Sequence, residues 1–171
     1  DLIEGVKKAV SNARDKGSKA SDKLGLGIVT NIEKSTDATD AKAGLAQAYS
    51  YYTATTTDAD GKITSCVLDA SQTDVNFDNT GKITSDLTVE QKTKNQPGDA
   101  YGMKKASKIG KEWNEQAASF ADYVIGKTVS QVKGIAVDEA EHPTGSDLTS
   151  SVTMSVGGLI GAIEKAAAGA K

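Results

Sequence analysis

The sequence has one cysteine, one arginine and few aromatic side chains, and each scarcity excludes a class of structure or site. Cys66 has no second cysteine in the chain, which excludes an internal disulfide and a cysteine-based zinc or iron–sulfur site, so we expect a small buried residue. Arg14 is the one arginine among 20 basic residues, which are outnumbered by 23 acidic ones. Because arginine is the main reader of phosphates and guanine edges, nucleic-acid binding is disfavoured.

Long apolar runs are absent as well. No run reaches the roughly 18 apolar residues of a membrane-spanning helix, and the first residues lack the apolar centre of a signal peptide. The chain begins at Asp1 rather than at Met, so we expect any targeting segment to lie outside this sequence. The 171 residues suffice for one domain with a short appendage, and small aliphatic side chains must build most of its core.

The first 22 residues predict a helix followed by a linker, because apolar residues recur at helical spacing before a polar stretch. Residues near the other end of the chain repeat this order. We therefore expect residues 1–22 to be the last helix and linker of an upstream repeat, and residues 23–171 to be the domain itself. The alternative is that two amphipathic helices share the pattern by chance. The matching residues are Leu2, Ile3, Val6, Lys8 and Ala9 with Leu159, Ile160, Ile163, Lys165 and Ala166.

The next part of the chain predicts an antiparallel sheet. Residues 24–32 alternate with the period of a strand, and residues 45–57 are rich in the tyrosine and threonine that favour strands. The pentapeptide Gly-Lys-Ile-Thr-Ser occurs at residues 61–65 and again at residues 81–85, each time after an acidic turn, so we expect two hairpins of one meander. In the strand over residues 62–70 we expect two apolar faces, Ile63 with Val67 and Cys66 with Leu68.

Beyond Pro97 the helical period returns. Apolar residues at 106, 109, 113, 117, 120 and 124 predict one long amphipathic helix that ends at Gly126. A short helical turn is expected over residues 129–135, and a last helix is expected to start within residues 149–155. The sequence thus predicts an α+β fold in which an antiparallel β-meander packs against a long amphipathic helix and a C-terminal helix. Four lysines gather on the first turns of the long helix, as a solvated face or as a patch that attracts anions: Lys104, Lys105, Lys108 and Lys111.

Few polar residues cluster in a way that predicts catalysis. His142 lies near Glu139, Glu141 and Asp147, but one imidazole among scattered carboxylates is more typical of a solvated loop than of a metal site. Ser150, His142 and Asp147 are the residue types of a hydrolytic triad, yet the strand-turn-helix elbow that exposes such a serine is missing. Neither a phosphate loop nor a dinucleotide glycine pattern is present.

The segment 147–153 has more hydroxyl groups than the start of a helix needs. A single Ser, Thr or Asp caps the free amides of a first turn, whereas this segment offers five such residues at the expected start of the last helix. The free N–H groups and the partial positive charge of a helix start suit a phosphate. A hydroxyl in this segment is therefore a candidate to form a phosphate ester.

The same residues resemble the signature of the FMN-binding domain family of covalently flavinylated, extracytoplasmic electron-transfer proteins. That signature is Asp, two variable residues, Ser or Thr, Gly, Ala and Thr, and an FAD:protein FMN transferase esterifies the last threonine to the phosphate of FMN. Asp147, Ser150 and Thr153 fall in register, with Thr153 as the acceptor. Two positions depart from the signature, since Ser151 stands in place of glycine and Val152 in place of alanine.

The resemblance extends over about residues 24–168 and is greatest to the members found in surface lipoproteins of Gram-positive bacteria. Residues 24–30, residues 98–104, the helix around Trp113 and residues 147–153 show it. It implies an extracellular, membrane-anchored lipoprotein with covalent FMN, often built from tandem modules. Such a protein passes electrons from a membrane quinone-linked reductase to extracellular acceptors such as ferric chelates, so a redox carrier is expected rather than a dedicated enzyme.

The resemblance also implies roles for residues around the ester. Asp147 would assist the transferase step, Ser150 and Ser151 would donate to phosphate oxygens, and Tyr101 and Met103 would lie against the isoalloxazine ring. Ordinary packing at a helix entry explains the last two residues equally well. Two other function classes stay open: a non-flavinylated surface binding module on the same fold, and a small-substrate flavin reductase. The residues expected to bind the cofactor are Thr153, Asp147, Ser150, Ser151, Thr149, Val152, Tyr101, Gly102, Met103 and Asp99.

Overall fold

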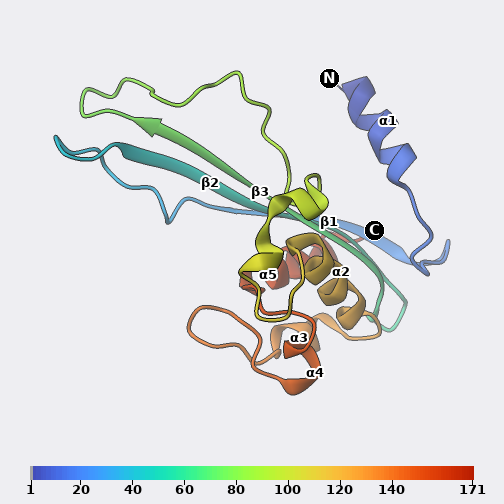
Figure 1. Ribbon diagram of the computed structural model, residues 1–171. Coiled ribbons are helices and arrows are strands. Elements are labelled where there is room, and N and C mark those ends of the chain that lie inside the picture. Colours follow the sequence, from blue (N-terminus) through green and yellow to red (C-terminus); the bar gives the residue numbers. More distant parts are fainter. Residues whose placement is uncertain (1) are drawn as a thin grey trace.

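The computed structural model describes residues 2–171 and confirms the α+β class (Figure 1). A three-stranded antiparallel sheet lies against a layer of helices. Within the described residues, no helix is long and apolar enough to cross a membrane. The elements in chain order are α1 (Leu2–Asn12), β1 (Lys23–Asn31), β2 (Gly44–Thr57), β3 (Ile63–Phe77), η1 (Gly98–Tyr101), η2 (Met103–Lys105), α2 (Trp113–Val124), α3 (Val129–Lys133), α4 (Ser146–Thr149) and α5 (Gly157–Ala168).

The sheet has the order β1-β2-β3, so each strand pairs with its neighbour in sequence. Thr55 in β2 stands opposite Gly25 in β1 on one side and Cys66 in β3 on the other. The turn over residues 58–61 joins β2 to β3, which confirms the first predicted hairpin. Cys66 is buried in the core, as expected.

The helices cover one face of the sheet, with α5 over β1 and β2 and α2 over β3. Gly25 and Gly27 allow α5 to lie directly on the backbone of β1, since a Cβ at either glycine would come within 1.9 Å of the carbonyl oxygen of Ala166 or Ala162. The opposite face of the sheet is open to solvent, and Leu26 on it is 71% exposed. The core lies between the sheet and the helices, with Phe120, Leu159 and Ile163 among its largest members.

The predicted start of the long helix at residue 106 is wrong, because α2 begins only at Trp113. Gly110 has a φ of 63°, a left-handed conformation that a helix interior does not adopt. Glu112 then forms a capping box with Glu115, which fixes the first turn. Residues 106 and 109 belong to the preceding loop, and their helical spacing to Trp113 is accidental.

The predicted start of the last helix within residues 149–155 is also wrong. A separate short helix, α4, ends at Thr149, and α5 begins at Gly157. Between them, the side-chain oxygen of Gln116 accepts hydrogen bonds from the backbone N–H groups of Thr153 and Met154. The segment is thus held by α2 as an extended loop, and the hydroxyl-rich residues do not form the mouth of α5.

One expectation about β3 fails, and the expectation of a second hairpin holds only in part. Thr56 pairs with Ser65 but Thr57 pairs with Ile63, so a bulge at residue 64 turns Ile63 to the face of Cys66, while Val67 points to solvent. The second hairpin reduces to a single bridge between Phe77 and Ile83. Beyond that bridge the Asp86 carboxylate accepts hydrogen bonds from Thr88 and bends the chain into a loop.

The predicted N-terminal helix is confirmed as α1, but none of its residues is buried. Figure 1 shows α1 standing apart from the sheet and the helical layer. Its apolar side chains are largely exposed, with Leu2 at 83% and Val10 at 71%. The predicted turn over residues 129–135 is confirmed as α3.

Candidate functional site

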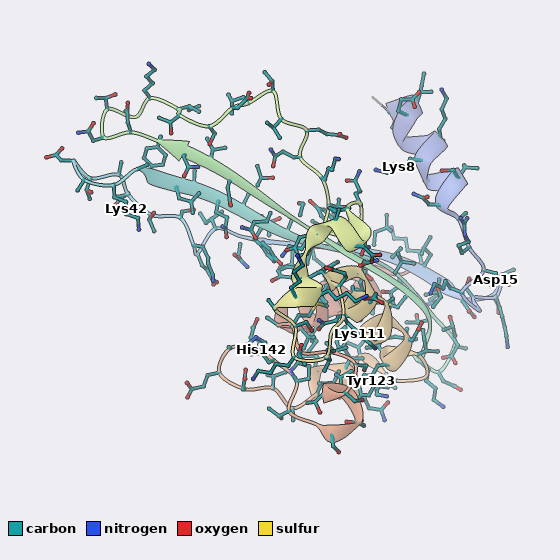
Figure 2. All side chains as sticks on the ribbon, viewed as in Figure 1. Lys8, Asp15, Lys42, Lys111, Tyr123 and His142 are labelled. Atoms are coloured by element: carbon teal, nitrogen blue, oxygen red, sulfur yellow. The ribbon has the colours of Figure 1, made fainter. Side chains whose placement is uncertain are left out.

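The candidate site is a pocket of about 530 Å³ between the sheet, the start of α2 and the loop before α5. The sheet provides two neighbouring tyrosines of β2, and the loop between β3 and α2 provides the opposite wall. The loop between α4 and α5 provides the third side. His142, labelled in Figure 2, comes from the loop before α4. The residues that line the pocket are Tyr49, Tyr51, Lys94, Tyr101, Gly102, Met103, Trp113, His142, Thr153, Met154 and Ser155.

Gln116 fixes the Thr153 wall of this pocket. Its side chain is fully buried, and its oxygen accepts from the Thr153 N–H at 2.8 Å, the Met154 N–H at 3.1 Å and the Thr153 hydroxyl at 3.3 Å. Its amide nitrogen donates to the Ser107 hydroxyl and to the Lys111 carbonyl oxygen, both at 3.2 Å. One side chain on α2 therefore ties together the two loops that form the pocket and orients the threonine hydroxyl.

Glu112 fixes the opposite wall. This buried carboxylate accepts from the backbone N–H of Met103 at 2.8 Å and from that of Lys104 at 3.0 Å. Glu115 accepts in turn from the Glu112 N–H at 2.8 Å. Hydrogen bonds to a carboxylate are stronger than those between neutral groups. The first two turns of α2 thus position Met103 through Glu112 and Thr153 through Gln116.

Aromatic rings and one lysine line the interior of the pocket. The Lys94 ammonium lies 4.5 Å from the ring centroid of Tyr49, 5.4 Å from that of Tyr101 and 5.8 Å from that of Trp113. The Tyr49 ring meets Tyr51 edge to face at 4.6 Å. Desolvation by burial raises the pKa of both tyrosines, so both stay neutral phenols at physiological pH.

His142 lines the pocket from a turn that begins at Asp138. The Asp138 carboxylate accepts from the backbone N–H of Ala140 and of His142, both at 2.9 Å, and lies 3.2 Å from Nδ1 of the His142 ring. These contacts, led by the His142 backbone N–H, lower the pKa of Asp138. Glu141 in this turn adopts a φ of 63°, and its carboxylate accepts from the Ser155 hydroxyl at 3.1 Å. The turn is thereby joined to the Thr153 loop.

The structure brings four of the ten residues expected to bind the cofactor to the pocket: Thr153, Tyr101, Gly102 and Met103. Thr153 comes from the loop before α5 and the other three from the η1–η2 loop, so residues about 50 positions apart meet there. Tyr101 is 38% exposed at the opening. Their expected roles toward a flavin stay predictions.

The other six residues do not line the pocket. Asp147 accepts from the Tyr123 hydroxyl at 2.7 Å, which raises the pKa of Tyr123. Val152 is fully buried in the core, where its larger side chain replaces the alanine of the signature without reaching the pocket. Ser151 donates its hydroxyl to the Leu148 carbonyl oxygen at 3.1 Å. The remaining three lie outside the lining, with Ser150 and Asp99 exposed and Thr149 half-buried at the end of α4.

The four-lysine patch (Lys104, Lys105, Lys108 and Lys111) lies on η2 and the loop after it, not on a helix face as predicted. Three of its members are exposed, and Lys111 reaches the Ser119 hydroxyl at 3.4 Å. Because the patch follows Met103 directly, positive charge borders one edge of the pocket. An anion that approaches this edge is attracted.

Sequence reasoning missed several functional candidates, above all Lys94, Gln116 and Glu112. Gln116 and Glu112 follow the helical spacing of the apolar residues on α2, and this position is the signal that could have marked them as buried. Lys94 gives no such signal, since it sits in a charged loop beside Lys92.

Comparison with known proteins gives one short match. A stretch of 41 residues is 51% identical to part of a protein named chlorophenol reductase from Desulfitobacterium hafniense. The match covers 24% of this chain and 12% of that protein. No family model matches the chain, and no solved structure matches it. The comparisons therefore assign no family.

Proposed function

We propose that this protein is an electron carrier with FMN esterified through its phosphate to the hydroxyl of Thr153. The observation that supports this most is the position of Thr153. The residue that the signature marks as the acceptor lines an aromatic pocket together with Tyr101 and Met103. Thr153 belongs to one segment that carries the resemblance, and Tyr101 and Met103 belong to another about 50 residues earlier in the chain.

The residues of the pocket fit a flavin. Its volume of about 530 Å³ lies in the range of small-molecule sites. Tyr101, Trp113 and Met103 offer the flat aromatic and polarizable surfaces against which an isoalloxazine ring packs. When bound, FMN supplies the one- and two-electron chemistry that the side chains of the pocket lack. Gln116 orients the Thr153 hydroxyl by accepting its hydrogen bond, which leaves the oxygen lone pairs free to form the ester.

The proposal includes the partners and the location implied by the resemblance. An FAD:protein FMN transferase attaches the cofactor, a membrane quinone-linked reductase supplies electrons, and extracellular acceptors such as ferric chelates remove them. The protein is then a cell-surface lipoprotein. The exposed Tyr101 at the opening and the four-lysine patch beside it support a carrier whose ring stays accessible to diverse acceptors.

We also infer that α1 is the closing helix of a preceding module. In α5, the backbone of Ala162 and Ala166 lies so close to Gly27 and Gly25 of β1 that a Cβ at either glycine would collide with it. Gly5 and Ala9 occupy the corresponding positions of α1. Lys165 donates to the Ile28 carbonyl oxygen at 2.8 Å, and Lys8 stands at its equivalent position. The exposed apolar face of α1 thus has the pattern that covers a glycine-bearing strand of this fold.

The function is tested by coexpression with a transferase. We expect the intact mass to rise by one FMN less one water, and the flavin to stay attached after denaturation. Thr153→Ala and Thr153→Val should lose the covalent flavin while the fold persists, and Thr149→Ala is the matched control that should keep it. Fully flavinylated Thr153 variants would contradict the assignment. A wild-type chain that never takes flavin favours the binding module, and saturable turnover of one small organic substrate favours the reductase.

A further inference from the structure

Lys94 is the one lysine or arginine among the residues that line the pocket. Its backbone is anchored to β3, because its N–H donates to the Ala70 carbonyl oxygen at 2.7 Å. The next residue, Asn95, donates its side-chain amide to the Leu68 carbonyl oxygen at 2.8 Å and its backbone N–H to Asp69 at 3.1 Å. The backbone of Lys94 is therefore fixed at the edge of the sheet, and its side chain lines the pocket.

The ammonium of Lys94 stays charged there without a carboxylate partner. The ion pairs found among residues 2–171 do not include Lys94. Burial acts to lower its pKa, but hydrogen bonding and electrostatic interaction with Tyr101 and Tyr49 together outweigh burial, so the pKa of Lys94 is raised. The ammonium nitrogen lies over the faces of three aromatic rings, 4.5 to 5.8 Å from their centroids. The pocket thus holds a positive charge that aromatic groups stabilise and that forms no ion pair with a carboxylate among the described residues.

We propose that Lys94 sets the electron affinity of the flavin by stabilising its reduced, anionic form. The inference rests on the proposed function. Oxidised isoalloxazine is neutral, and uptake of two electrons and one proton leaves the ring with one negative charge. A cation beside the ring stabilises that charged form over the neutral one, whichever ring atom lies closest. Because the site is partly desolvated, the attraction is stronger than the same pair would have in water.

This role predicts that charge, and not side-chain length, is what matters at position 94. Lys94→Met keeps an unbranched apolar stem against the rings and removes the charge. Lys94→Arg keeps the charge and can stack on the same rings. Lys108→Met removes an equal charge from the four-lysine patch, outside the pocket lining, and is the matched control.

The test is a spectroelectrochemical titration of protein shown by intact mass to hold one FMN. In Lys94→Met we expect the equilibrium constant for two-electron reduction to fall at least tenfold, which lowers the midpoint potential by at least about 30 mV. Lys94→Arg and Lys108→Met should stay close to wild type. If Lys94→Met misfolds by circular dichroism, Lys94→Gln is titrated in its place.

The outcomes separate the two proposals. A flavin-loaded Lys94→Met protein with the wild-type potential overturns the role of Lys94 and leaves the proposed function standing. Equal shifts in Lys94→Met and Lys94→Arg also overturn it, because packing rather than charge would be the cause. If the intact mass of the wild-type chain shows no added FMN after coexpression with the transferase, the proposed function is overturned, and the role of Lys94 is overturned with it.

Discussion

Gln116 shows how a single buried amide holds the site in place. Its side-chain oxygen accepts hydrogen bonds from the backbone N–H groups of two consecutive residues, Thr153 and Met154, which lie outside any helix. Leaving a buried donor without a partner costs about 1–3 kcal/mol. Thr153 is therefore presented by α2 through Gln116, although the two residues are 37 positions apart in the chain.

We predict that Gln116→Leu lowers the free energy of unfolding by about 1–3 kcal/mol, because both N–H groups lose their acceptor. The variant should also take up less flavin, since the Thr153 hydroxyl is no longer oriented. Urea unfolding and intact mass measure the two effects. Gln91→Leu in the exposed loop is the control, with an expected change within about 0.5 kcal/mol. Wild-type stability in Gln116→Leu would contradict the structural role.

Some residues of the site could be predicted from the sequence and others could not. Thr153 was predictable because a short motif marks it, and Tyr101 and Met103 because they lie within a second segment that carries the resemblance, residues 98–104. Asp147 belongs to the same motif, yet it pairs with Tyr123 outside the pocket. A motif specifies spacing along the chain, whereas the direction of a side chain depends on tertiary contacts that the motif does not contain.

At the scale of elements, turns were more predictable than helix starts. The turns at residues 58–61 and 78–81 follow from Asp-x-x-Gly, and in both the Asp carboxylate accepts the N–H groups two and four residues on. Asp138 makes the same hydrogen bonds, but this third turn was missed. Glu141 stands there in the positive-φ position that Gly61 and Gly81 occupy. The glycine signal is therefore absent from this turn, and the Glu141 carboxylate accepts a hydrogen bond from the Ser155 hydroxyl.

The inference about α1 leads to a helix-exchange experiment. We predict that a chain in which residues 159–168 are replaced by the sequence of residues 2–11 still unfolds cooperatively, because α1 has a small residue wherever α5 meets Gly25 or Gly27. Thermal unfolding followed by circular dichroism is the measurement. The same graft with leucine at the positions of Gly5 and Ala9 is the control and should not fold. Failure of the unmodified graft would contradict the equivalence of α1 and α5.

At the scale of the whole molecule, the charge distribution makes a prediction about electron transfer. Lys104, Lys105 and Lys108 are exposed on the loop that borders the pocket, although the chain as a whole has a net charge of −3. Changing all three to glutamine should slow reoxidation of the loaded protein by anionic ferric chelates at low salt. The difference should shrink at high salt, because ions screen exposed charges.

Stopped-flow absorbance at low and high ionic strength measures this effect, and a neutral quinone analogue is the matched acceptor that the charge change should not affect. Equal rates for the triple variant and wild type with the ferric chelate would contradict the steering role of the patch. The lysines themselves were predictable from the sequence. Their place at the edge of the pocket was not, because it depends on the loop that replaces the first half of the expected helix.

Locating the flavin on the chain decides whether Thr153 carries it. Trypsin cleaves after Lys133 and Lys165, so residues 134–165 form one peptide with every candidate hydroxyl of the motif. After coexpression with the transferase and denaturation, fragmentation of this peptide by tandem mass spectrometry should place one FMN phosphoester on Thr153. A flavin on Thr149, Ser150 or Ser151 would contradict attachment at Thr153. An unmodified peptide from protein whose intact mass includes one FMN would contradict it as well.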